Sequence, residues 1–433
     1  MADFMQQPLR EAAKAAPGWL AGTLNRGQAA WRETRLPTRK TEAWKYNDLG
    51  ALQHTFTAPT AGRAPALEDV DYPRLDGPTL VFADGVFCPE LSQLELPAGV
   101  QLVRFADAGA EQAQAIVERL GTAVHHSRHL FAPLNDATLA DGVYLEIAPD
   151  TVVEKPIHLM WLSSGRTEAL SVTQRLLVAV GAHSRATVVE TFANTAADGV
   201  VFTNGISELL LSEGASLNHN RLHLEGGRAV HIGGVHALLA ANANLDGFHL
   251  ALGSDLKRID IVVQHEGQGA HCRLNGLYLP RGEEQVDYHT CIEHAVPDCT
   301  SEENFRGIIG DESRAIFNGR IHIHPDAQRT RAELHNKNLL TSREAEVNTK
   351  PELEIYADDV QCAHGATVAQ MDATALHYLR TRGICRAEAE VMLSYGFINE
   401  LVEDIPCEAL RDYLKPLLAR RFARSPRLTR HLA

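Results

Sequence analysis

A cysteine and a histidine two residues apart, Cys362 and His364, form the pair in this sequence best suited to holding a metal. If residues 360–368 form a β-strand, both side chains point to the same face, with Cα atoms about 6.5–7 Å apart. A thiolate and an imidazole at that separation can share a soft metal ion or an iron of a cluster. Two ligands do not complete a site of four, so the others would come from elsewhere in the chain or from a partner. The spacing equally fits a small buried cysteine beside a hydrogen-bonded histidine, and spacing alone favours that structural interpretation.

Two other groups of donor residues also have strand-like spacing. One row would line a single strand face: Asp287, His289, Cys291 and Glu293. We interpret this row mainly as ordinary solvent-facing residues. His322 and His324 have the same geometry as the first pair, but the sequence shows no third partner, so we expect them at the surface.

The paired carboxylates Asp358 and Asp359 could indicate a polysaccharide-cleaving enzyme if the chain is a β-helix. Such enzymes are typically exported, and the N-terminus shows no basic segment followed by an apolar one. The sequence also contains no HExxH, GxxxxGK[ST] or GxSxG motif. The residues alone therefore indicate no reaction.

Composition narrows the class of protein. The 433 residues include 45% hydrophobic and 22% charged residues, as in an ordinary globular protein, and the net charge is −14. That charge disfavours nucleic acid as a partner. No apolar run approaches the roughly 20 residues needed to cross a bilayer. The seven cysteines form no CxxC pair, which argues against a disulfide framework or a zinc finger, so we expect a cytoplasmic protein.

The elements that would position these residues fall into three regions. Residues 6–52 have helical periodicity, and residues 57–78 are rich in Pro, Ala and Gly, as in a linker. Residues 80–368 show repeated period-2 alternation, with one clearly helical stretch near 107–120. Helical periodicity returns from residue 372. These last helices are apolar enough either to pack on their own chain or to dock another protein, and we leave both open.

A weak repeat runs through the middle region. Small-residue turns begin at residues 181, 214, 242 and 267, with spacings of 33, 28 and 25 residues. A unit of strand, tight turn and strand at this period is typical of one coil of a β-solenoid. A sandwich or barrel would show spacings of roughly 8–12 residues without the longer repeat. The period therefore favours a β-helix.

Several stretches resemble one family. Residues 36–46 (LPTRKTEAWKY), 318–323, 336–340, 348–367 and 378–384 are similar to motifs of SufB and SufD, the paired scaffold subunits that work with the ATPase SufC in SUF iron–sulfur cluster assembly. SufB-like chains tend to read Glu-His-Glu-Ala where residues 362–365 read Cys-Ala-His-Gly, and carry a cysteine just upstream. Residues 338–350 contain none, so the chain resembles the SufD branch.

The resemblance implies a mainly β fold, a parallel right-handed β-helix over residues 79–370. An N-terminal helical region with a linker (1–78) and a C-terminal helical region (371–433) would flank it. It implies a non-catalytic scaffold that pairs with a SufB-like subunit through the β-helix and docks a SufC-like ATPase on the C-terminal helices. A homodimer of the chain alone is a further expectation.

By position, the resemblance implies that Cys362 and His364 lie at the subunit interface. There they would hold iron or a transient iron–sulfur cluster together with SufB, with no tightly bound cofactor in the isolated chain. Two alternatives stay open: a SufB-like subunit that holds the nascent cluster itself, and a β-helix carbohydrate-active enzyme.

Overall fold

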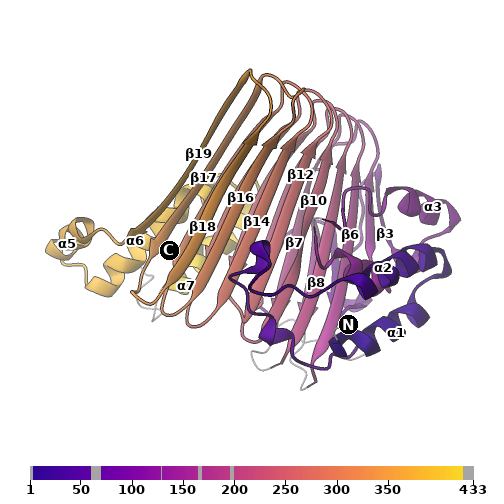
Figure 1. The fold of residues 1–433 in the computed structure, drawn as a ribbon, viewed down its shortest axis with the longest axis horizontal. Coiled ribbons are helices and arrows are strands. Elements are labelled where there is room, and N and C mark those ends of the chain that lie inside the picture. Colours follow the sequence, from indigo (N-terminus) through magenta and orange to yellow (C-terminus); the bar gives the residue numbers. More distant parts are fainter. Residues whose placement is uncertain (1–2, 60–69, 128, 164–167, 196–198, 423–433) are drawn as a thin grey trace.

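Two long β-sheets face each other and form a parallel β-solenoid of about seven turns. In the computed structural model, residues 3–59, 70–127, 129–163, 168–195 and 199–422 are described. Each coil contributes one strand to each sheet, so sequential strands alternate between them (Figure 1). The β-helix favoured by the repeat and the parallel strands implied by the resemblance are both confirmed.

Sheet A has nine strands, which are β3 and the even-numbered strands from β4 to β18, and it ends on β3. Its strands are β3 (Val100–Arg104), β4 (Val143–Ile147), β6 (Leu170–Val180), β8 (Val201–Leu211), β10 (Ala229–Leu239), β12 (Leu256–His265), β14 (Gln285–His294), β16 (Arg314–Ile323) and β18 (Glu346–Ile355).

Sheet B has ten strands, which are the odd-numbered strands other than β3 together with β2, and it ends on the β1–β2 hairpin. Its strands are β1 (Thr79–Ala83), β2 (Val86–Phe87), β5 (Ile157–Ser163), β7 (Arg185–Asn194), β9 (Ser216–His223), β11 (Asn244–Leu252), β13 (His271–Leu279), β15 (Thr300–Ile309), β17 (Thr330–Leu340) and β19 (Val360–Gln370). Residues 60–69, part of the expected linker, lie outside the described residues.

Apolar columns in register hold the coils together. One column runs through eight strands of sheet A: Leu145, Val178, Leu209, Ala237, Val263, Ile292, Ile321 and Leu353. Because side chains alternate between the two faces of a strand, this column lies between the sheets and forms part of the main core. A one-residue slip would expose every member of it, so the hydrophobic pattern sets the register.

The repeated turns all join a strand of sheet A to the next strand of sheet B. Residues 181, 214, 242 and 267 lie between β6 and β7, β8 and β9, β10 and β11, and β12 and β13. Gly214 and Asn242 adopt left-handed backbone conformations, with φ of 65° and 54°. Glycine and asparagine tolerate that region best, which explains why small turn residues recur at the coil period.

Helices cover the outer face of each sheet. The N-terminal helices α1 (Gln6–Ala15) and α2 (Ala21–Glu33), with α3 (Ala110–Arg119) and α4 (Ala132–Ala137), lie on the side of sheet A. α6 (Arg386–Glu403) and α7 (Glu408–Phe422) pack on sheet B, and α5 (Ala373–Thr381) projects from the body (Figure 1). α3 confirms the helix expected near 107–120. α4 was missed because six residues show too little periodicity.

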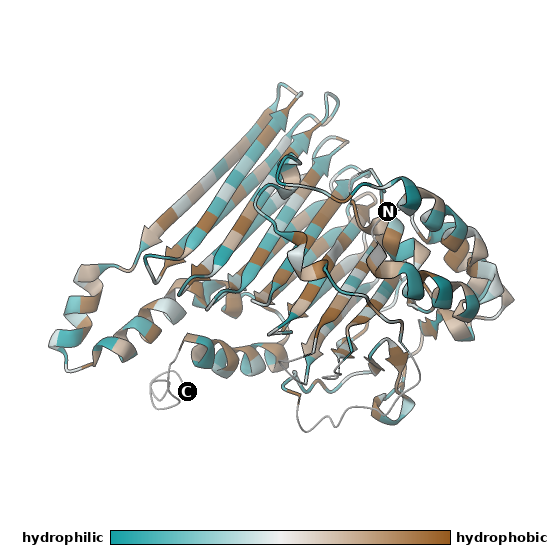
Figure 2. Ribbon diagram, turned by 60° about the horizontal axis from the view of Figure 1, so that its bottom comes forward, coloured by the Kyte–Doolittle hydropathy of each residue, from teal (hydrophilic) through white to brown (hydrophobic). Residues whose placement is uncertain are grey.

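The C-terminal helices are packed on their own chain. Ile398, Leu401, Leu410 and Leu414 share one apolar cluster with Leu277 and other residues on the outer face of sheet B. Figure 2 shows apolar segments on these helices where they approach the sheet. Of the two interpretations left open for α6 and α7, packing is therefore the one observed. Within the described residues, no helix has both the length and the apolar character needed to span a membrane.

Candidate metal site at the open end of the solenoid

Cys362 and His364 lie on one face of β19, as their spacing predicts. Their register partners on β17 are Ala332 and Leu334, both fully buried in the core between the sheets. Both side chains therefore belong to the inward face of the last strand. Cys362 is partly buried against the core, whereas His364 is exposed. The pair is neither sealed in the core nor on the outer surface of the sheet.

The charge state of the Cys362 thiol depends on its surroundings. Burial raises the pKa of Cys362, and a backbone hydrogen bond with Ala332 opposes that effect only in part. The thiol thus stays protonated at neutral pH, and a metal would have to displace the proton before it could bind.

The solenoid is uncapped at this end. β18 and β19 are the edge strands of the two sheets, and neither pairs with a further strand among the described residues. Apolar side chains are exposed there: Ile355 at 41%, Tyr356 at 62% and Val368 at 49%. An unpaired strand edge with exposed apolar residues is a surface that another protein can cover.

A second group of possible metal-donor residues lies on the outer face of sheet A. Its members were treated separately in the sequence analysis. Glu293 of β14 is the register partner of His322 on β16, and the Glu293 Oε1 to His322 Nδ1 distance is 3.8 Å. The rings of His322 and His324 lie 4.4 Å apart. The sequence showed no third partner for the two histidines, which we expected at the surface; the structure places Glu293 beside them, and both are partly buried. Glu293 and His322 are 29 residues apart, within the range of the coil repeat, and that spacing could have paired them.

The row that contains Glu293 divides into two parts. Asp287 is fully buried, so the expectation that it faces solvent is wrong. Its carboxylate accepts hydrogen bonds from Arg258 at 2.8 Å and from Asn47 at 2.5 Å, and His289 lies 3.1 Å away. Burial would raise the pKa of Asp287, but Arg258 and His289 lower it overall. Asp287 thus anchors the N-terminal segment through Asn47, whereas Cys291 lies beside Arg320 and Glu293 lies beside His322.

A buried group of similar composition consists of His223, Glu225 and His231. His231 Nδ1 lies 2.7 Å from Glu225 Oε1, and His223 Nδ1 lies 3.9 Å from Oε2. Lys257 is fully buried, with its ammonium 3.8 Å from the same carboxylate. The lysine thus supplies the positive charge beside Glu225, which makes this group an internal ion pair rather than an empty metal site.

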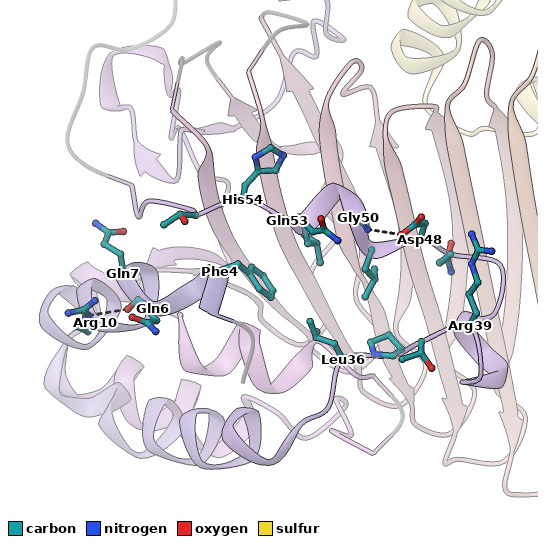
Figure 3. A pocket seen from close by; sticks show the side chains of 16 residues that line it. Phe4, Gln6, Gln7, Arg10, Leu36, Arg39, Asp48, Gly50, Gln53 and His54 are labelled. Carbon is teal, nitrogen blue, oxygen red and sulfur yellow. Dashed lines mark hydrogen bonds between the residues drawn. The ribbon is translucent and has the colours of Figure 1, made fainter.

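A surface groove and an exposed acidic pair lie elsewhere on the molecule. The groove drawn in Figure 3 has a volume of about 780 Å³, but its labelled polar side chains are spread along it and do not converge on one point. Asp358 and Asp359 are both exposed in the turn before β19. This turn is hydrogen-bonded to the turn before β17. The backbone N–H of Arg329 donates to the Asp359 carbonyl, and the backbone N–H of Asp359 donates to the Gln328 side chain.

Two family models match almost the whole chain. The model described as "SUF system FeS cluster assembly, SufBD core domain" matches residues 162–397, and the "SufBD protein N-terminal region" model matches residues 13–159. The first match includes β19 with Cys362 and His364, together with the Glu293 group.

Individual relatives agree with these matches. The iron–sulfur cluster assembly protein SufD of Escherichia coli is 32% identical over 393 residues, which cover 90% of each chain. An iron–sulfur cluster assembly SufBD family protein of Synechocystis is 29% identical over 88% of this chain and 86% of its own. SufD of Bacillus subtilis is 26% identical over 76% of each chain.

Proposed function

The chain belongs to the SufBD family of iron–sulfur cluster assembly proteins, and on that premise we propose that it is a non-catalytic scaffold subunit that pairs with a SufB-like subunit and docks a SufC-like ATPase. The pairing surface in this proposal is the open end of the solenoid formed by β18 and β19. The docking surface is the projecting α5 with the outer side of the C-terminal helices.

The uncapped end is the observation that carries the proposal. Ile355 and Val368 are exposed apolar residues of the last coil, and no further strand among the described residues covers them. A second solenoid placed against this end would continue both sheets through backbone hydrogen bonds and bury these side chains. A SufB-like subunit is the partner of matching architecture in the same family.

Cys362 and His364 have a role in this arrangement. They lie on the inward face of the edge strand, beside the surface that the partner would cover. One thiolate and one imidazole supply half of a tetrahedral set, so a cysteine of the partner would be needed to complete it. The iron or growing cluster is cargo held transiently between subunits, and the isolated chain would hold it weakly.

The docking role is supported by the exposure of α5. None of its residues is buried, and Tyr378 is 57% exposed, with the guanidinium of Arg382 5.2 Å from its ring centroid. An exposed tyrosine beside an arginine, on a helix that contributes nothing to the core, is typical of an interaction surface. ATP-driven motion of the docked ATPase would reach the solenoid through α6, because α6 packs directly on sheet B.

Co-purification tests the proposal. The tagged chain is co-expressed with the SufB-like and SufC-like proteins of its own organism, either unchanged or as Val368→Lys. A charge at Val368 should abolish retention of the SufB-like subunit, because the ammonium would be buried unpaired. Val117→Lys is the matched control, since Val117 is a valine of similar exposure. It lies on α3, between β3 and β4, which form the end of sheet A opposite to β18. Equal retention by Val368→Lys and the unchanged chain would refute the pairing surface.

A further inference from the structure

The outer face of sheet A brings together three side chains with the donor atoms of a transition-metal site. One donor atom each of Glu293, His322 and His324 lies within 4.8 Å of the other two. They come from β14, from β16 and from the residue that directly follows β16. Two imidazoles and one carboxylate are a ligand set typical of divalent iron and zinc.

The ring nitrogens of this group are buried without hydrogen-bond partners. His322 Nδ1 and His324 Nε2 are both inaccessible to solvent and have no partner among the described residues. Buried polar atoms are normally paired, because leaving one unsatisfied costs about 1–3 kcal/mol. A bound cation would remove that cost for both nitrogens.

Charged side chains of three neighbouring strands surround this group: Glu293 on β14, Arg320 on β16 and Glu354 on β18. The guanidinium of Arg320 is paired with Glu354 at 2.8 Å. Glu293 supplies the carboxylate of the donor set.

We propose that Glu293, His322 and His324 form a binding site for a divalent first-row transition metal on the outer face of the solenoid. It is separate from the Cys362 and His364 pair, which lies on the inward face of sheet B. Ligand atoms around such a metal lie about 3–4 Å apart, so the side chains need to close by only about 1 Å. Three protein ligands leave coordination positions open to an exogenous ligand. The assignment of Fe²⁺ as the ion bound in the cell rests on the proposed function.

Cobalt titration of the isolated full-length chain tests the site. A Cys362→Ser/His364→Ala background removes the candidate ligands at the open end of the solenoid, and Co²⁺ binding is followed by its visible d–d absorption and by calorimetry. The background protein should bind one equivalent. His322→Ala and the isosteric Glu293→Gln should each weaken that binding by at least about tenfold, by analogy with the effect of losing supporting metal contacts. His335→Ala should not, because His335 has Glu333 at 3.7 Å but no second histidine.

The possible results separate the two proposals. If the background protein binds no cobalt, or if both His322→Ala and Glu293→Gln keep the stoichiometry and affinity of the background, the metal site is wrong. Circular dichroism and thermal unfolding show whether each variant is folded. If either His322→Ala or Glu293→Gln is misfolded, the result of the folded variant decides. The proposed scaffold function is measured by co-purification and does not depend on any of these results.

Discussion

The guanidinium of Arg258 on β12 lies over the indole ring of Trp44, 4.6 Å from the ring centroid. Its Nη1 donates to the carbonyl oxygen of Ala43 at 2.7 Å and to Asp287 Oδ2 at 2.8 Å. Residues 43 and 44 belong to the LPTRKTEAWKY motif on which the family resemblance partly rests. In this structure the motif fastens the N-terminal segment across the outer face of sheet A (Figure 1).

Replacing Arg258 should destabilise the fold strongly. Arg258→Met leaves Asp260 and Asp287 without their common partner while Asp287 remains buried. Breaking a buried ion pair in this way costs about 3–5 kcal/mol of unfolding free energy. Arg331→Ala is the control, because its pair with Glu333 is largely exposed and should contribute about 0–1 kcal/mol. Urea unfolding measures both, and similar losses in the two variants would contradict the clamp.

Glu303 should make the protein less stable as pH rises. It lies on the same face of β15 as the core residue Phe305, and burial raises the pKa of its carboxyl to about 8 from 4.5. The unfolded chain releases this proton near pH 4.5, whereas the folded protein holds it to about pH 8. Folding stability contributed by this group is therefore fully present below pH 4.5, falls between pH 4.5 and about 8, and is constant above.

Glu303→Gln should remove that loss. At pH 8 the variant should be more stable than the unchanged chain by a few kcal/mol, because each pKa unit corresponds to about 1.4 kcal/mol. Glu302→Gln, an exposed neighbour on the opposite face, should change little. Chemical unfolding at pH 5, 6.5 and 8 measures the effect. A Glu303→Gln protein that is less stable at pH 8 would mean that the carboxylate is ionised and paired in the folded state.

His364→Ala should leave the complex assembled but block cluster delivery in cells. The exposed imidazole contributes little to packing, so retention of the SufB-like and SufC-like proteins should be unchanged. Maturation of an iron–sulfur reporter enzyme should fall to the level seen without the chain. His335→Ala, an exposed histidine on the outer face of the neighbouring strand β17, should leave maturation intact. Normal maturation with His364→Ala would disprove a role of this residue in holding cargo.

Tyr378→Ala should weaken docking of the ATPase without affecting the fold. α5 buries none of its residues, so the melting temperature should stay the same. A central aromatic contact typically contributes about 2 kcal/mol or more to binding. Tyr46→Ala serves as the control, since Tyr46 is also an exposed tyrosine but lies in the N-terminal segment. Pull-down of the SufC-like protein in unaltered amount would place its docking surface elsewhere.

Deleting residues 386–418 is a poorer test of docking than a substitution on α5. The deletion removes α6 and most of α7, and so exposes buried residues on sheet B such as Leu222, Leu250 and Leu277. Burial of one leucine contributes roughly 1.5–3 kcal/mol, so the truncated chain should be unstable or aggregate. Reduced thermal stability and loss of soluble protein would be the expected result.

Local patterns in the sequence determined the solenoid and the orientation of Cys362 relative to His364. Period-2 alternation and the recurrence of small turn residues arise from strand and turn geometry within a few residues, and both are visible without coordinates. The same local geometry puts residues i and i+2 on one face of β19. The six-residue α4 fell below what periodicity can detect.

Only the tertiary structure decided which face is inward, that the solenoid ends uncapped at β19, and that α6 and α7 pack on sheet B. It alone also brought Glu293 beside His322 and Arg258 beside Trp44. These contacts join residues 29 and 214 positions apart, and they depend on the register between coils. That register is set by the combined burial of apolar columns across many strands, which no short window of sequence contains.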